Sequence, residues 1–223
     1  MAAPSALLRE LASDQPHEEL LPVLPPLSGL LPGGSLRRGC VIAVERSGLL
    51  CMTLAAGTSA AGGWCAVVGM PELGMLAAAD AGVDLGRLLL VPDPGPRWPH
   101  VVAALLEGCE LVLLRPPDRP SAQVTRRLAA HARRSRGVLV VAGSWAGAHL
   151  WLRLAHPNWV GIDAGHGRIR GRRVLVIAGG RGGGARPRAQ WWWLPGPNGA
   201  AAVVEQEAAD VAEQEIAEGL SSG

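Results

Sequence analysis

Residues Val41 to Ala56 read VIAVERSGLLCMTLAA: an apolar run typical of a buried strand, a short loop, and an Ala/Leu-rich run typical of a helix. A strand that leads through a glycine-containing loop into a helix is the frame in which many α/β proteins bind nucleotide phosphates. In the ordinary motif, backbone N–H groups wrap the phosphates, a lysine neutralises them, and the next Ser or Thr holds magnesium. The loop between this strand and helix is therefore the first candidate site.

This loop lacks the residues that phosphate chemistry needs. Gly48 is present, but Leu49 and Leu50 stand where the lysine and the hydroxyl belong, and all 21 basic Lys+Arg residues of the chain are arginine. The loop is also about two residues short and has no counterpart of the first glycine. We predict no intact phosphate cradle, no nucleotide cofactor and no catalytic residue in this degenerate loop, which consists of Glu45, Arg46, Ser47, Gly48, Leu49 and Leu50.

On either side of the loop, apolar strand-like runs alternate with helix-like runs. This alternation predicts an α/β fold with a mostly parallel sheet flanked by helices. Ser121 is expected to cap a helix that extends to about Arg134 and is ended by Gly137. Strands expected between Ile169 and Trp193, joined by a Gly/Arg loop at 179–186, form a C-terminal β extension. The other expected elements are helices near 51–61, 75–81 and 100–107 and strands near 64–68, 111–114 and 138–142.

Composition narrows the class of protein. A hydrophobic content of 48% over 223 residues fits one globular domain. The first residues carry no basic segment leading into an apolar stretch, and no apolar run reaches membrane-spanning length, so we expect a cytoplasmic protein without a membrane segment. The cysteines and histidines lack metal-ligand spacing, which favours buried reduced thiols over zinc or disulfides at Cys40, Cys51, Cys65 and Cys109.

Charge is unevenly distributed behind the net value of +2. Residues 1–114 hold six Arg and eleven acids, residues 115–199 hold fifteen Arg and two acids, and residues 200–223 hold six acids and no base. A concentrated positive region predicts an anionic partner, with DNA or RNA first. The alternative is that these arginines simply take the place of lysine on an ordinary solvated surface.

Several segments occur in the order found in RecA. They are LLPGGSLRRG at 30–39, AGVDLGRLL at 81–89, the helix and strand at 122–142, and GHGR at 165–168 with RVLVI at 173–177 followed by Arg186, Pro187 and Trp191. Over residues 20–197 the chain resembles the RecA-related ImuA family of actinobacterial type. The resemblance implies a Pro-rich lead-in at 1–28, a RecA-like core at 29–199, and an acidic tail at 200–223.

Other catalytic positions of that fold are also altered. The strand ending near Leu114 is followed by Arg115 where an ATPase places a magnesium-binding acid. Glu72 falls near the position of a water-activating carboxylate, although a surface role in a loop is the simpler interpretation. Residues 143–147 replace the polar sensor and the long DNA-binding loop of RecA, which argues against nucleotide sensing and filament-type DNA binding.

The basic region offers candidate DNA contacts around a glycine-rich turn. Arginines there could meet phosphates with salt-sensitive affinity, and Trp191, Trp192 and Trp193 could stack on bases. Because side chains alternate along a strand, at least one side of the tryptophan run is expected to be core. An acidic protein is the alternative partner for the candidate arginines, which are Arg168, Arg170, Arg172, Arg173, Arg181, Arg186 and Arg188.

The acidic tail carries the last candidates. Its small apolar residues fall roughly on one helical side, so the tail is either a weak helix that folds on a partner or a disordered segment. The partner-binding candidates are Val204, Ala208, Val211 and Ile216.

Three functions follow from these features. The resemblance implies a non-catalytic adaptor in damage-induced mutagenesis that joins an ImuB-type polymerase-like subunit and an error-prone polymerase during translesion synthesis. Association with the nucleoid and self-association of the chain are left open. The alternatives are an active RecA-like DNA-dependent ATPase or recombination mediator, and a SulA-like cell-division inhibitor. The first is our prediction, because the phosphate and magnesium positions are both lost.

Overall fold

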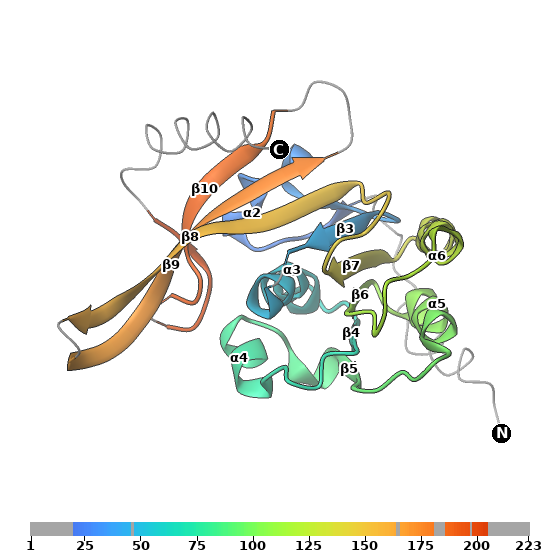
Figure 1. The fold of residues 1–223 in the computed structure, drawn as a ribbon, viewed down its shortest axis with the longest axis horizontal. Coiled ribbons are helices and arrows are strands. Elements are labelled where there is room, and N and C mark those ends of the chain that lie inside the picture. The colour runs from blue at the N-terminus through green and yellow to red at the C-terminus, as the bar shows by residue number, and fades with distance from the viewer. Residues whose placement is uncertain (1–19, 46, 164–165, 181–185, 197, 205–223) are drawn as a thin grey trace.

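The computed structural model describes residues 20–45, 47–163, 166–180, 186–196 and 198–204. Within them, the centre is a nine-stranded sheet in the order β11-β10-β9-β8-β3-β7-β6-β4-β5 (Figure 1). Its strands are β3 (Val41–Val44), β4 (Cys65–Val68), β5 (Leu88–Val91), β6 (Leu111–Leu114), β7 (Val138–Ala142), β8 (Leu150–Asp163), β9 (His166–Gly180), β10 (Arg188–Trp193) and β11 (Ala202–Val203).

The sheet has a parallel part and an antiparallel part. Strands β5, β4, β6, β7, β3 and β8 are parallel neighbours, whereas β8, β9, β10 and β11 form an antiparallel extension. The predicted α/β fold with a mostly parallel sheet and a C-terminal β extension is therefore confirmed.

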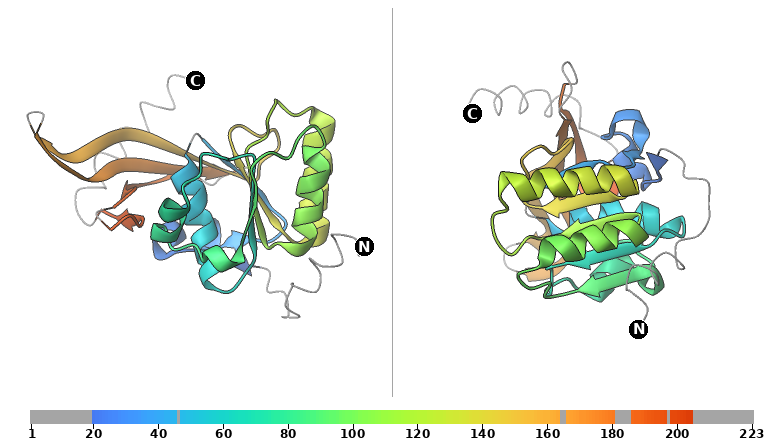
Figure 2. Two further views of the ribbon diagram at one scale, coloured as in Figure 1. Left: turned by 90° about the horizontal axis from the view of Figure 1, so that it is seen from below. Right: turned by 90° about the vertical axis from the view of Figure 1, so that its right-hand side faces the viewer.

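Helices cover both faces of the parallel part (Figure 2). On one face, α3 (Gly48–Ala60) and α4 (Met75–Asp80) belong to the apolar cluster that includes Ile42 and Val44. On the other, α5 (Trp98–Gly108) and α6 (Ala122–Ser135) pack with the cluster that includes Val41 and Ala43. Because consecutive strand residues point to opposite faces and both faces are buried, these strands are apolar throughout.

The long hairpin of β8 and β9 extends well beyond the rest of the sheet (Figure 1). We did not predict β8 from the sequence. Its register against β9 shifts between Ala155 and Asn158 and again between Val160 and Ile162, and Pro157 lies within the first shift. These irregularities break the alternation by which a strand is recognised from sequence.

Helix α6 begins as predicted, because the Ser121 Oγ accepts a hydrogen bond from the Val124 N–H at 3.3 Å. Its end differs from the prediction. The left-handed residue that terminates the helix is Arg136, with φ of 60°, and not Gly137. Gly137 is favoured for another reason: a Cβ there would make a tight contact of 3.1 Å with the carbonyl oxygen of Leu106.

The chain ends add to the core beyond the predicted boundaries. Before residue 29, Leu21 and Leu27 are fully buried, and after residue 199, β11 pairs with β10. The remaining short elements are β1 (Leu20–Leu21), paired with β2 (Leu36–Arg37), α2 (Pro25–Ser28), and the 3-10 turns η1 (Pro32–Gly34) and η2 (Leu85–Arg87). Among the described residues, no helix has the length and apolar character needed to cross a bilayer.

Candidate functional site

The degenerate loop joins the carboxyl end of β3 to α3, at the sheet edge where parallel α/β proteins bind ligands. Ser47 is buried and caps α3: its Oγ accepts a hydrogen bond from the Leu50 N–H at 3.1 Å. One of the N–H groups that a phosphate would need is therefore already bonded within the helix. Glu45 is exposed, and Arg46 lies outside the described residues.

Apolar side chains surround the start of α3. Leu50 is fully buried, and a Cβ at Gly48 would lie 3.7 Å from both the Leu73 Cδ1 and the Met70 Cε atoms. Leu49 is half-buried and packs against the core. A phosphate at this helix start would meet hydrocarbon on two sides and no lysine, which disfavours its binding.

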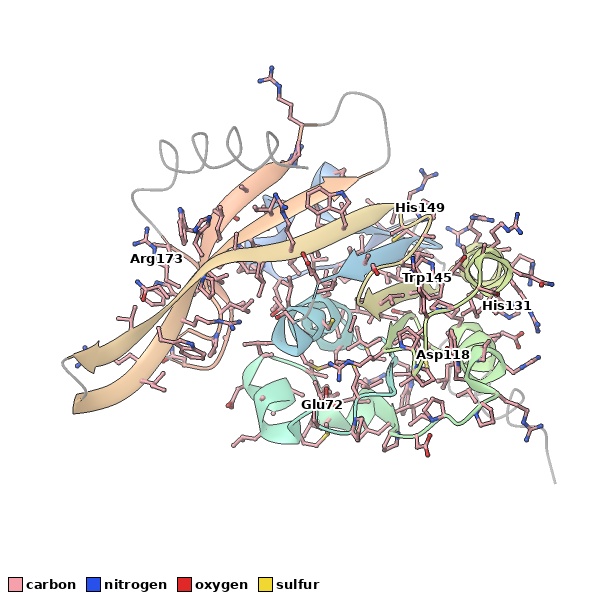
Figure 3. All side chains as sticks on the ribbon, viewed as in Figure 1. Glu72, Asp118, His131, Trp145, His149 and Arg173 are labelled. Carbon is pink, nitrogen blue, oxygen red and sulfur yellow. The ribbon has the colours of Figure 1, made fainter. Side chains whose placement is uncertain are left out.

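Arg115 and Glu72, which occupy the expected magnesium-binding and water-activating positions, lie together. Arg115, which follows β6, forms an ion pair with Glu72, which follows β4. Glu72, labelled in Figure 3, thus contacts a protein cation at the surface, which answers the question that the sequence left open about its role. The hydrogen bond from Arg115 holds the pKa of the Glu72 carboxyl below its ordinary value. A protein cation therefore neutralises the carboxylate at the sheet edge where an ATPase would place magnesium.

Close backbone contact fixes the segments that carry this pair. The Arg115 N–H donates to the Val68 carbonyl at 2.9 Å, and the Gly69 N–H donates to the Val91 carbonyl at 3.0 Å. Gly69 has φ of 71°, and a Cβ there would clash with the carbonyl oxygen of Arg115. Glycine is therefore required where the two segments cross.

Residues 143–147 lie beside a hollow of about 690 Å³. Trp145 is buried in the α5/α6 cluster, so this loop packs onto the core and leaves no long segment for DNA. The hollow is lined on its other sides by Glu45, Trp151 and Arg153. The hollow is open to solvent.

The candidate arginines do not form one patch. Since β9 side chains alternate, Arg172 and Arg173 point to opposite faces of the hairpin. The Arg172 Nε donates to the Leu194 carbonyl at 2.8 Å, and burial lowers the pKa of Arg172. The Arg188 Nη1 donates to the Leu31 carbonyl at 3.0 Å, which ties β10 to the amino-terminal segment.

Arg170, Arg186 and Arg188 are the exposed members of the set whose side chains are described. Arg168 lies in β9, but its side chain is outside the described part, as is all of Arg181. Of the three exposed arginines, Arg188 bonds to the Leu31 carbonyl, and the less exposed Arg172 and Arg173 also have contacts within the fold.

Trp191, Trp192 and Trp193 are not exposed as the base-stacking hypothesis requires. Trp192 is fully buried and Trp191 is 8% exposed, on opposite faces of β10, while Trp193 is half-buried. The expectation that part of this run is core is confirmed. The exposed indoles are instead Trp151 and Trp159, on the strand that the sequence analysis missed.

Each exposed indole on β8 has an arginine above its ring. The Arg153 guanidinium carbon lies 5.5 Å from the Trp151 ring centre, and that of Arg172 lies 5.3 Å from the Trp159 ring centre. Trp151 itself lies across Gly179 of β9, where a Cβ would clash with the indole. Two tryptophans and an arginine within residues 150–163 were the signal that could have identified this surface.

The sequence also makes predictions for the cysteines, the acidic tail and metal ligands. Cys40, Cys51, Cys65 and Cys109 are buried free thiols, as predicted. Val204 is half-buried against β10, whereas Ala208, Val211 and Ile216 lie outside the described residues. No group of three metal-ligating side chains occurs within the part of the chain that the structure describes.

Comparisons with known proteins agree with this fold. The structure is similar to the crystal structure of the flagellar accessory protein FlaH from Methanocaldococcus jannaschii, with a TM-score of 0.55 and 12% sequence identity over 84% of this chain and 100% of that one. This likeness supports the RecA-like fold that the sequence predicts.

The sequence itself has relatives. It is 36% identical over 189 residues to the uncharacterized protein Rv3395c from Mycobacterium tuberculosis, covering 79% of this chain and 88% of that protein. Residues 29–147 match the MT3502 N-terminal domain family. The chain therefore belongs to the MT3502 N-terminal domain family.

Proposed function

We propose that this protein is a non-catalytic adaptor of the ImuA type, acting in damage-induced mutagenesis. It would bring together an ImuB-type polymerase-like subunit and an error-prone polymerase for translesion synthesis at damaged DNA. The observation that carries the proposal is the pairing of Arg115 with Glu72, together with a helix start where Leu49 and Leu50 replace the lysine and the hydroxyl of the ordinary motif. The residues at the expected phosphate-binding, magnesium-binding and water-activating positions thus make other contacts within the fold.

The fold around these altered positions is still that of the RecA-like class. The sheet order, the helices on both faces and the β extension persist without the residues of nucleotide chemistry. A fold retained without its chemistry can still supply surfaces for partners. The protruding β8–β9 hairpin exposes Trp159 and Ile169, at 51% and 54% of their surface. We assign the protein contact of the adaptor to these two side chains.

Nucleotide binding gives the first test. Calorimetry with Mg²⁺ and ATP, and hydrolysis of radiolabelled ATP with and without single-stranded DNA, are expected to show neither binding nor turnover. Saturable magnesium-dependent binding that is abolished by Gly48→Val would favour the ATPase or recombination-mediator alternative and would overturn the proposal.

Recovery of partners gives the second test. The tagged full-length chain, purified from cells after DNA damage, is expected to carry an ImuB-type subunit, and Trp159→Ala with Ile169→Ser should remove it. Leu76→Ser is the matched control, because Leu76 is 76% exposed on α4, away from the hairpin. Recovery of a cell-division protein instead would support the SulA-like alternative.

A further inference from the structure

One face of the sheet lacks a helical layer among the described residues. Trp151 is the neighbour of Ala43 across β8 and β3, so it lies on the face that α5 and α6 cover further along the sheet. The same face continues across β8, β9 and β10 through Ala155, Leu175 and Trp191, which pair in register. We call this surface the β8–β10 face.

The β8–β10 face has an apolar floor. Leu175 is fully buried, Ile177 is 5% exposed and Trp191 is 8% exposed, and together they form a cluster of their own. Neither α5 nor α6 takes part in that cluster; Ala155, Ala189 and Val204 pack against it. An apolar cluster on a sheet face is stable when another layer covers it.

Two arginines stand above this floor with incomplete hydrogen bonding. Arg173 lies on the β8–β9 hairpin (Figure 3). Its guanidinium carbon lies 4.7 Å from the Trp191 ring centre, and Arg153 lies over Trp151. The Nε atoms of both arginines are buried, and within the described part of the chain neither has a hydrogen-bond partner. Buried guanidinium N–H groups of this kind call for an acceptor, and a carboxylate is the best one.

The chain itself leads onto this face. The Val204 N–H donates to the Trp191 carbonyl at 2.9 Å, and the Val204 side chain packs on the apolar cluster. Residues 205–223 follow, with six acids and no base. Ala208 and Val211 continue the helical spacing that begins at Val204, and Ile216 follows one position after Glu215, which interrupts the stripe. Sixteen residues of helix would span about 24 Å, enough to cross three strands spaced about 4.8 Å apart.

We propose that residues 205–220 dock on the β8–β10 face as an amphipathic helix. Their apolar side would cover Leu175, Ile177 and Trp191, and their carboxylates would accept hydrogen bonds from Arg153 and Arg173. The tail would thus supply the helical layer that α5 and α6 supply elsewhere. This proposal is independent of the proposed function, since it concerns a contact within one chain.

Amide hydrogen exchange on the full-length protein tests the docking. Residues 205–220 are expected to exchange at least tenfold more slowly than an unfolded peptide of the same sequence. Arg153→Gln with Arg173→Gln should remove most of this protection. So should Glu207→Gln, Asp210→Asn and Glu213→Gln together, which leave the described core untouched. Arg127→Gln, on the exposed side of α6, is the matched control and should change nothing.

Truncation after Val204 completes the experiment, because it removes the tail and keeps β11 in place. The truncated chain should show faster exchange in β9 and β10 and no change in β4 to β6. Exchange of the tail at the unfolded rate in the intact protein would overturn the proposal. If the tail exchanged at the unfolded rate and the intact protein self-associated in a way that Arg173→Gln abolished, the β8–β10 face would bind a second copy of the chain instead.

Discussion

Arg115 and Glu72 are 43 positions apart in the chain and form an ion pair at the carboxyl edge of β4 and β6. Their pairing predicts how Glu72 titrates. Its folded-state pKa is held below the ordinary value of 4.5, mainly by the hydrogen bond from Arg115. The pair therefore adds stability above pH 4.5, and this contribution is lost as the pH falls through the lowered pKa.

An NMR titration of the Glu72 side-chain carboxyl carbon measures this directly. The midpoint should lie below 4.5 in the native protein and rise in Arg115→Gln. Arg119→Gln, exposed on the same segment, should leave it unchanged. A midpoint that does not respond to Arg115→Gln would show that the pair does not persist in solution.

Gly57 of α3 is predicted to tolerate no larger residue. A Cβ at this position would lie 2.5 Å from the Val23 Cα and 2.8 Å from the Leu24 backbone nitrogen. Since backbone atoms cannot move aside cheaply, Gly57→Ala should destabilise the fold by about 1–3 kcal/mol. Urea denaturation followed by Trp fluorescence checks this. Gly48→Ala, where the nearest atoms are 3.7 Å from the added carbon, should cost far less, and equal losses in the two variants would contradict the prediction.

The four thiols are predicted to be unreactive in the native protein. Burial raises the pKa of Cys40, Cys51 and Cys109 to about 12 and also raises that of Cys65. At pH 8, Ellman's reagent should therefore detect almost no thiol until denaturant is added, when it should detect four. Because unfolded thiols ionise near pH 9.0, the free energy of unfolding should fall above that pH. Rapid labelling of the native protein would contradict this assignment.

Any affinity for single-stranded DNA is predicted to depend on Arg170 and Arg186, which are exposed, rather than on Arg188, which is exposed but bonded to the Leu31 carbonyl. Arg170→Gln with Arg186→Gln should reduce the slope of log affinity against log salt by about 1.4, or roughly 0.7 for each phosphate contact. Fluorescence anisotropy between low and physiological salt measures the slope. Arg126→Gln with Arg127→Gln, exposed on α6, is the control. An unchanged slope, or no binding at low salt, would assign these arginines to a solvated or protein-binding surface.

Local signals in the sequence predicted the parallel half of the fold. The cap at Ser121, the apolar runs and their order were enough to place α6 and β7 and to identify the degenerate loop, because each depends on neighbouring residues. We did not predict that α6 ends at Arg136, because a glycine such as the adjacent Gly137 adopts a left-handed conformation more readily. Gly137 is instead explained by the close approach of Leu106.

The candidate site was harder to predict because it depends on distant contacts. No local pattern indicates that Arg115 reaches Glu72, since the two segments meet only through β4 and β6. The arginine set looked continuous in the sequence, but alternation along β9 divides it between two faces. The exposed Trp151 and Trp159 were missed for the same reason as β8, whose irregular register hides its strand character.

The position of β3 in the sheet has a consequence for synthesis of the chain. β3 (Val41–Val44) lies between β7 (Val138–Ala142) and β8 (Leu150–Asp163), so both of its neighbours are translated roughly a hundred residues after it. At ribosomal speeds of about 5–20 residues per second, its edges stay unpaired for about 5–20 s. During this interval an apolar strand is open to pairing with other chains. Nascent chains that stop before β7 should therefore aggregate or occupy chaperones, whereas those that reach past β8 can close the sheet.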